Sequence, residues 1–117
     1  MKKPIKTYDT FDIVVVPFPF VDTHEVKKRP ALVLSSSRSF NDHTHASVMA
    51  MITSQVHTPW PCDVSITDLE ASGLPVQSII RMKLFTLDHR LIIKCIGKLG
   101  KNDQKTLTNA LHMLLPV

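Results

Sequence analysis

Cations at the ends of apolar segments are the residues of this sequence best suited to chemistry. Lys27, Lys28 and Arg29 run directly into Pro30 and an apolar stretch. A long cation at the entrance of a buried strand is held in place while its head group stays in water, which suits it to binding phosphate. The alternative is that the three cations only solubilise a loop before a core strand, as runs of charge commonly do.

Other side chains with chemical potential are scattered along the chain. His43 and His45 stand two residues apart in a polar segment, but no Cys or His cluster supplies the further ligands that zinc needs, so we expect no metal. His24, beside the basic cluster, is a candidate for ligand contact or for a base, or else an exposed loop histidine. Trp60, between two prolines, can stack on a base, or cover a barrel end or a dimer partner.

Length and composition limit the classes of protein to consider. The chain has 117 residues, of which 44% are hydrophobic and 21% charged, and this fits one globular domain. The 14 Lys and Arg outnumber the 10 Asp and Glu, which favours polyanionic partners such as nucleic acid or an acidic protein. The two cysteines form no CxxC pair, and no apolar run has the roughly 20 residues of a membrane span. We therefore expect a soluble protein of the reducing cytoplasm.

The pattern of apolar residues predicts the elements that must position the cations. Five to seven short strands followed by one amphipathic helix, without βαβ alternation, indicate a mainly β fold: a small antiparallel sheet or barrel capped by a helix. We expect residues 1–10 to lie loosely on the surface. The predicted strands cover residues 11–17, 30–36, 46–54, 63–66, 78–87 and 90–99.

Turn and cap residues add finer expectations. Pro17 and Pro19 should interrupt strand pairing or produce a bulge, and Pro30 should take the first position of its strand. Gly73 should end a helical turn over residues 68–72, and Gly97 is a possible bulge. Asn102 or Asp103 should cap a helix running to about residue 115, with Leu107, Ala110, Leu111 and Leu114 along one stripe.

Several segments, taken in order, resemble the MazF/PemK family of toxin–antitoxin ribonucleases. The matching segments are FDIVVVPFPF at 11–20, KKRPALVLS at 27–35, VMAMITSQ at 48–55, DLEASGLPVQSIIR at 68–81, KLFTLDHRLI at 83–92 and IGKL at 96–99. The resemblance implies a small SH3-like antiparallel β-barrel with a C-terminal helix, assembled as a homodimer. It also implies a sequence-specific, metal-independent endoribonuclease that cuts single-stranded RNA, needs no cofactor, and is inhibited by the acidic segment of a cognate antitoxin.

The resemblance carries two catalytic residues onto this sequence. The arginine of the family's R-P step falls on Arg29, and the threonine that closes the third strand falls on Thr53. A guanidinium can hold two phosphoryl oxygens, and a hydroxyl can donate to the same group or orient the attacking 2′-OH. If the second and third strands pair antiparallel, the start of one lies beside the end of the other. Further RNA contacts are expected from His24, Lys27, Lys28, Ser54, Gln55, Arg81 and Lys83.

One departure from the family pattern affects the expected mechanism. Some branches carry an acidic residue two positions after the arginine of the fifth-strand segment, where this chain has Lys83. A lysine can stabilise a phosphorane or act as an acid, but an unshifted lysine is a poor base. The departure favours the pair of Arg29 and Thr53, with Arg81 and Lys83 on one strand face as phosphate contacts or as a solvated surface. Two alternatives stay open: a non-catalytic, gyrase-binding toxin like CcdB, and a degenerate relative that binds antitoxin or RNA without cleavage.

Overall fold

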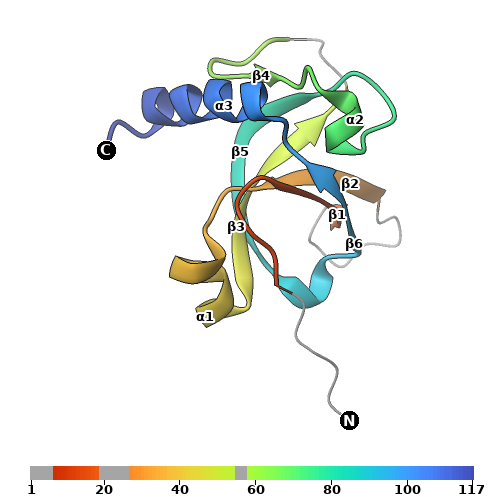
Figure 1. The fold of residues 1–117 in the computed structure, drawn as a ribbon, viewed down its shortest axis with the longest axis vertical. Helices are drawn as coiled ribbons and strands as arrows, with labels where there is room; N and C mark the ends of the chain where they lie inside the picture. The colour runs from red at the N-terminus through yellow and green to blue at the C-terminus, as the bar shows by residue number, and fades with distance from the viewer. Residues whose placement is uncertain (1–6, 19–26, 55–57) are drawn as a thin grey trace.

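A strongly curled antiparallel sheet with a C-terminal helix forms the framework of the molecule (Figure 1). The computed structural model describes residues 7–18, 27–54 and 58–117. Within this part the strand order is β4-β5-β3-β2-β1-β6. The strands are β1 (Asp12–Phe18), β2 (Lys27–Val33), β3 (Ala46–Thr53), β4 (Val64–Ser65), β5 (Ile79–Asp88) and β6 (Lys94–Lys98), and the α-helices are α1 (Asp42–Thr44), α2 (Leu69–Ser72) and α3 (Lys101–Leu114). The predicted mainly β fold with a C-terminal helix is confirmed.

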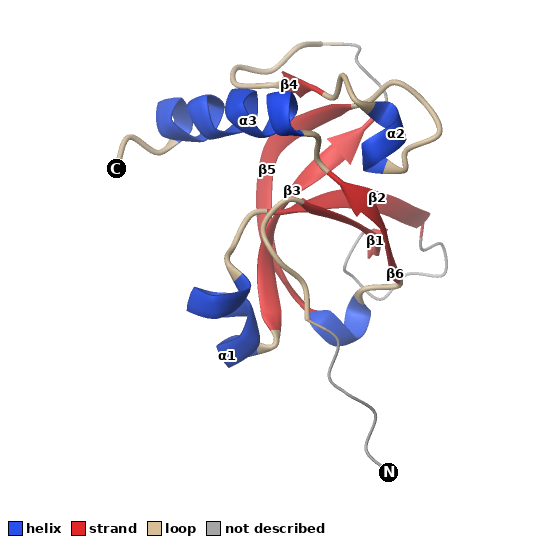
Figure 2. Cartoon of the chain, viewed as in Figure 1, coloured by secondary structure: helices blue, strands red, loops and turns tan. Residues whose placement is uncertain are grey.

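The sheet is covered on both faces, which explains why its strands are almost continuously apolar. The first core lies under α3, which crosses one end of the sheet beside β4, with α1 at the opposite end (Figure 2). Its buried residues include Ile13, Leu32, Ala50, Ile52, Ile80 and Leu107. The second core lies on the other face and includes Val14, Val16, Ala31, Val33, Met49 and Leu87. Because successive side chains of a strand alternate between faces, one run of β-branched residues feeds both cores.

The C-terminal helix is attached to the barrel by a buried carboxylate. Gly100 precedes the first turn of α3, so the prediction of Asn102 or Asp103 as the cap is wrong. Asp103 lies inside the first turn and accepts hydrogen bonds from the backbone N–H of Thr67 (2.9 Å) and of Asp68 (3.1 Å) and from the Thr67 hydroxyl (2.7 Å). These bonds fix α3 to the segment between β4 and α2. No helix in the described part of the chain is long and apolar enough to cross a membrane.

The prolines do not limit the strands as predicted. Pro30 is the fourth residue of β2, not the first, and pairs with Val15. The ladder from β2 to β3 begins only at Ala31, so Pro30 lies where β2 has a single neighbour and a missing N–H is tolerated. Pro17 pairs with Lys28 inside the β1–β2 ladder without a bulge, so it does not interrupt that pairing. Pro19 lies outside the described residues.

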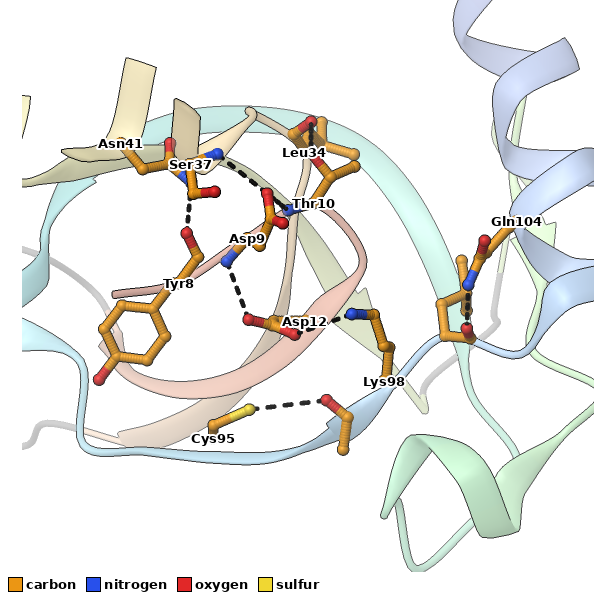
Figure 3. Close-up of polar contacts among 12 residues, drawn as sticks. Tyr8, Asp9, Thr10, Asp12, Leu34, Ser37, Asn41, Cys95, Lys98 and Gln104 are labelled. Atoms are coloured by element: carbon orange, nitrogen blue, oxygen red, sulfur yellow. Dashed lines mark hydrogen bonds and ion pairs between the residues drawn. The ribbon is translucent and has the colours of Figure 1, made fainter. Parts of the chain in front are cut away.

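Within the segment predicted to lie loosely on the surface, Tyr8 and Asp9 are held firmly, and residues 1–6 lie outside the described residues. Tyr8 is buried, and its carbonyl oxygen accepts a hydrogen bond from the Asn41 side chain at 2.8 Å (Figure 3). The carboxylate of Asp9 accepts hydrogen bonds from the backbone N–H of Thr10 (2.8 Å) and of Ser37 (2.9 Å). The start of the described chain is thus tied to the π-helical turn Ser37–Asn41.

Two glycines allow α2 to pack closely on β6. Gly73 ends α2 at a φ of 72°, as predicted, and a Cβ there would lie 2.0 Å from the Ile96 carbonyl oxygen. A Cβ on Gly97 would lie 2.3 Å from the Ser72 carbonyl oxygen, so this glycine is required for close approach. The pairing of β1 with β6 shifts register between Ile13 and Val14, beside Gly97. The sixth strand is shorter than predicted, since a 3₁₀ turn over His89–Leu91 precedes it.

Candidate active site

Arg29 and Thr53 lie on the face of the sheet that carries the second core, just past the edge of that core. Ala31 and Val33 point into the second core, so Arg29, two residues earlier on β2, shares their face. Likewise, Thr53 shares the face of Met49 on β3. The face that is apolar within the second core is therefore polar at this end of the sheet.

The antiparallel register brings Arg29 and Thr53 toward each other. Ala31 pairs with Met51 in the β2–β3 ladder, and continuing this register by two residues on each strand sets Arg29 opposite Thr53. A pocket of about 220 Å³ opens at this point. Its lining residues are Phe18, Arg29, Met51, Thr53, Arg81 and Lys83, contributed by four adjacent strands. Four residues singled out from the sequence are thus brought together.

An irregularity in β5 places Lys83 at the pocket. Met51 pairs with Arg81, whereas Ala50 pairs with Leu84, so Met82 and Lys83 have no counterpart on β3. Because the insertion has an even number of residues, Arg81 and Lys83 lie on the same face of the sheet as Phe85, which packs against the second core. Lys83 is exposed and carries its charge into the pocket opening.

Arg81 is neutralised by a carboxylate behind the pocket. Its Nε and Nη2 donate to the Asp63 side chain at 3.2 and 2.9 Å, and Nη2 also donates to the Thr58 carbonyl at 3.0 Å. Both partners are largely shielded, with side chains 12% and 14% exposed. The hydrogen bonds from Arg81, together with one from the backbone N–H of Trp60, lower the pKa of Asp63 and keep it ionised. Asp63 is therefore unsuited to act as a general base near neutral pH.

Arg29 differs from Arg81 in its surroundings. Among the described residues, no carboxylate forms an ion pair with Arg29, and its side chain is half-buried. The guanidinium is thus partly shielded from water by the strands, while no carboxylate of the described ranges compensates its charge. This is the arrangement expected for a cation that awaits an anionic ligand.

The other predicted contacts lie around the pocket or outside the described residues. Lys27 and Lys28 are exposed at the start of β2, and Ser54 is exposed directly after Thr53. His24 and Gln55 fall outside the described residues. Asp63 was not anticipated, although the β4–β5 register, in which Val64 pairs with Ile80, sets it opposite Arg81. Within the described ranges, no three His, Cys, Asp or Glu side chains come together as a metal site would require.

Comparisons with known proteins agree with this fold. Residues 9–115 match the family model described as a PemK-like, MazF-like toxin of type II toxin–antitoxin system. MazF from Deinococcus radiodurans superposes with a TM-score of 0.74 at 22% identity, covering 96% of this chain and 99% of that one. A MazE–MazF complex from the same organism gives 0.76 at 20% identity, with the same coverage.

A more distant structure is also similar. An endoribonuclease from a mycobacterial species, solved in complex with its cognate antitoxin, gives a TM-score of 0.72 at 15% identity and 95% coverage of both chains. No curated protein matches the sequence significantly.

Proposed function

Because the chain belongs to the PemK-like, MazF-like toxins of type II toxin–antitoxin systems, we propose that it is a sequence-specific endoribonuclease that cuts single-stranded mRNA in the cytoplasm without a metal ion. The observation that carries this proposal is the pocket that gathers Arg29, Thr53, Arg81 and Lys83 on one face of the sheet. Three cations and a hydroxyl around a small cavity suit a phosphodiester with its negative charge.

In the proposed reaction, the ribose 2′-OH loses its proton to solvent water and attacks the adjacent phosphorus, and the 5′-oxygen of the next nucleotide leaves and takes up a proton. Arg29 holds two phosphoryl oxygens through its planar fork and stabilises the charge of the phosphorane. The Thr53 hydroxyl donates to the phosphate or orients the attacking hydroxyl. Lys83, exposed at the opening, supplies further positive charge or a proton for the leaving oxygen.

Binding of the RNA backbone extends beyond the pocket in this proposal. Lys27 and Lys28 are exposed next to Arg29 and contact neighbouring phosphates, which contributes to affinity more than to the chemical step. Ser54, exposed directly after Thr53, is a further candidate contact for the RNA backbone. The formal net charge of +4 adds a long-range attraction for RNA.

We also propose that the active form is a homodimer and that a cognate antitoxin inhibits it. A MazE–MazF complex and an endoribonuclease–antitoxin complex are among the structures with the same fold. An acidic antitoxin segment suits the charge of the pocket, because three cations line it and one carboxylate, Asp63, offsets Arg81.

The direct test incubates the purified protein with a long RNA in EDTA and maps the fragment ends. We expect discrete cuts at one short sequence, each leaving a 2′,3′-cyclic phosphate or its hydrolysis product. Arg29→Ala should reduce cleavage by about 100-fold or more, as the loss of a donor to a developing charge commonly does. Lys105→Ala, which removes an exposed lysine from α3, is the matched control and should cut like the wild type.

Two results would contradict the proposal. Wild-type activity in Arg29→Ala would exclude the arginine mechanism. Intact RNA together with trapped gyrase–DNA complexes would indicate a toxin of the CcdB type, and intact RNA with retained antitoxin binding would indicate a non-cleaving relative.

A further inference from the structure

Trp60 is a large aromatic side chain left half-open beside the pocket. It is the only tryptophan of the sequence, and 41% of it is exposed. The Arg81 guanidinium carbon lies 5.1 Å from the centre of its ring, and the Lys83 ammonium nitrogen lies 5.0 Å from it. Both cations also line the pocket, so the indole contacts side chains that form the pocket wall.

The backbone holds Trp60 in a fixed place. The N–H of Asp63 donates to the Trp60 carbonyl at 3.3 Å and closes a tight turn, with Pro61 and Cys62 at its centre. Proline suits the first of these positions, and Cys62 has a φ of 67°, as the second central residue of a type II turn requires. The Asp63 carboxylate also accepts a hydrogen bond from the backbone N–H of Trp60 at 2.8 Å. One carboxylate thus fixes both Trp60 and Arg81.

A positively charged pocket beside an exposed aromatic ring is a combination suited to binding single-stranded nucleic acid. Cations track the phosphates, and a flat ring offers a stacking surface to any base. Arg81 is tied to Asp63, but among the described residues Lys83 has no carboxylate partner and can leave the ring when a base arrives. Its ammonium can then contact the phosphate attached to that base.

We propose that Trp60 is the stacking platform for an unpaired RNA base next to the phosphate in the pocket, and that Asp63 positions it. This inference rests on the proposed function, since it assigns a base-binding residue to the same site. The platform contributes to substrate affinity and register, and it takes no part in proton transfer.

The lone tryptophan makes the test direct, because its fluorescence reports only on this position. The probe is a mixed-sequence single-stranded RNA with 2′-fluoro sugars and an end label, which lacks the attacking hydroxyl. We expect saturable quenching of Trp60 emission that follows the binding measured by anisotropy of the label. An abasic oligomer of equal length and charge should bind more weakly and leave the emission unchanged.

Substitutions separate the platform from general charge. Trp60→Ala should weaken binding of the probe by about 10- to 100-fold, in the range found for loss of one stacked base, and Trp60→Phe by less. Lys105→Ala should bind like the wild type. Trp60→Phe retains an aromatic ring and guards against a folding defect in Trp60→Ala, which circular dichroism would reveal.

The outcomes distinguish this inference from the proposed function. The platform would be overturned if the probe binds without quenching Trp60 emission, or if it does not bind at all. It would also be overturned if quenching depends on protein concentration alone, because a second copy would then cover Trp60. If the wild type cuts RNA and Trp60→Ala cuts it with unchanged KM, only the platform fails. If the probe quenches Trp60 but no RNA is cut, the platform stands and the nuclease proposal fails.

Discussion

At the scale of single residues, the two arginines of the pocket differ in the charge they offer. Arg81 is held by the Asp63 carboxylate through two hydrogen bonds. Arg29 lies at the same pocket without an ion-pair partner among the described residues. Since a compensated guanidinium attracts phosphate less, Arg29 is the stronger candidate for the reacting group and Arg81 for the support of the site.

Arg29→Lys tests whether geometry or charge matters at this position. Lysine keeps the positive charge but loses the planar fork that holds two oxygens. We expect kcat to fall by about 10-fold or more while KM changes little, because the fork acts on the transition state more than on the bound substrate. Steady-state cleavage of a short RNA containing the mapped site measures both constants. Undiminished kcat would show that charge alone is sufficient.

Asp63→Asn should change the pH dependence of stability. The hydrogen bonds from Arg81 lower the native pKa of Asp63 below its ordinary value of 3.8. A lowered native pKa stabilises the fold above the unfolded pKa, and this contribution is lost as pH falls through the native pKa. The wild type should therefore exceed Asp63→Asn in free energy of unfolding at pH 7, and the two should converge below about pH 4.

Urea titrations across this pH range supply the measurement. Asp88→Asn is the matched control, because Asp88 pairs with Arg90 at the surface, where Arg90 is 90% exposed. A surface pair of this kind contributes little. A difference for Asp63→Asn that did not vary with pH would refute the assignment.

At the scale of elements, the sequence predicts strand faces better than strand ends. Once 46–53 is taken as a strand, its two-residue period places Met49, Met51 and Thr53 on one face, as the structure has them. The start of β2 does not follow from Pro30 alone, because a strand tolerates a proline wherever it has a single neighbouring strand. Only the sheet order reveals that Pro30 lies where β2 pairs with β1 alone.

The site was only partly predictable from the sequence, because its assembly also depends on the order of the strands. Arg29, Thr53, Arg81 and Lys83 were each selected from the sequence, and their meeting at one pocket needed the order of four strands. Asp63 gave no sequence signal of its own, since its role depends on the β4–β5 register and on a turn with a positive φ at a cysteine. Long-range pairing of this kind is not encoded in local composition.

The attachment of α3 rests on Asp103, and its removal should be costly. Asp103→Ala deletes a carboxylate that is 3% exposed and leaves three donors on Thr67 and Asp68 without their acceptor. We expect a loss of about 3 kcal/mol in free energy of unfolding, as for charged acceptors that serve several buried donors. Thermal and urea unfolding measure it, with Lys105→Ala as the exposed control on the same helix. A change within about 0.5 kcal/mol, typical of surface sites, would contradict this role.

At the scale of the whole molecule, the far end of α3 leaves an apolar surface open. Leu107 and Ala110 are buried in the first core and Leu111 packs against it, but the side chains from His112 onward are exposed. A groove of about 360 Å³ runs between this end of the helix and the sheet. The exposed apolar residues of this region are Leu84, Met113, Leu114, Leu115 and Val117, and the groove is lined mainly by Leu34, Val48, Leu84, Leu111 and Leu115.

A surface of this kind, on a chain proposed to form a homodimer, is the first place to seek the interface. Leu115 is 49% exposed and also lines the groove, so a second copy seated there would bury it. A carboxylate at this position would then be desolvated without a partner. In the isolated chain it would remain in water at little cost to the fold.

Leu115→Asp should therefore shift the protein from dimer to monomer. At concentrations where the wild type is also monomeric, the two proteins should have nearly the same melting temperature. Light scattering after size exclusion measures the mass, and Lys105→Asp controls for the added negative charge. A dimeric Leu115→Asp would place the interface elsewhere on the molecule, and a monomeric wild type at tens of micromolar would refute the dimer itself. If cleavage disappears together with the dimer while Arg29 and Thr53 stay in place, the complete substrate groove must draw on both copies.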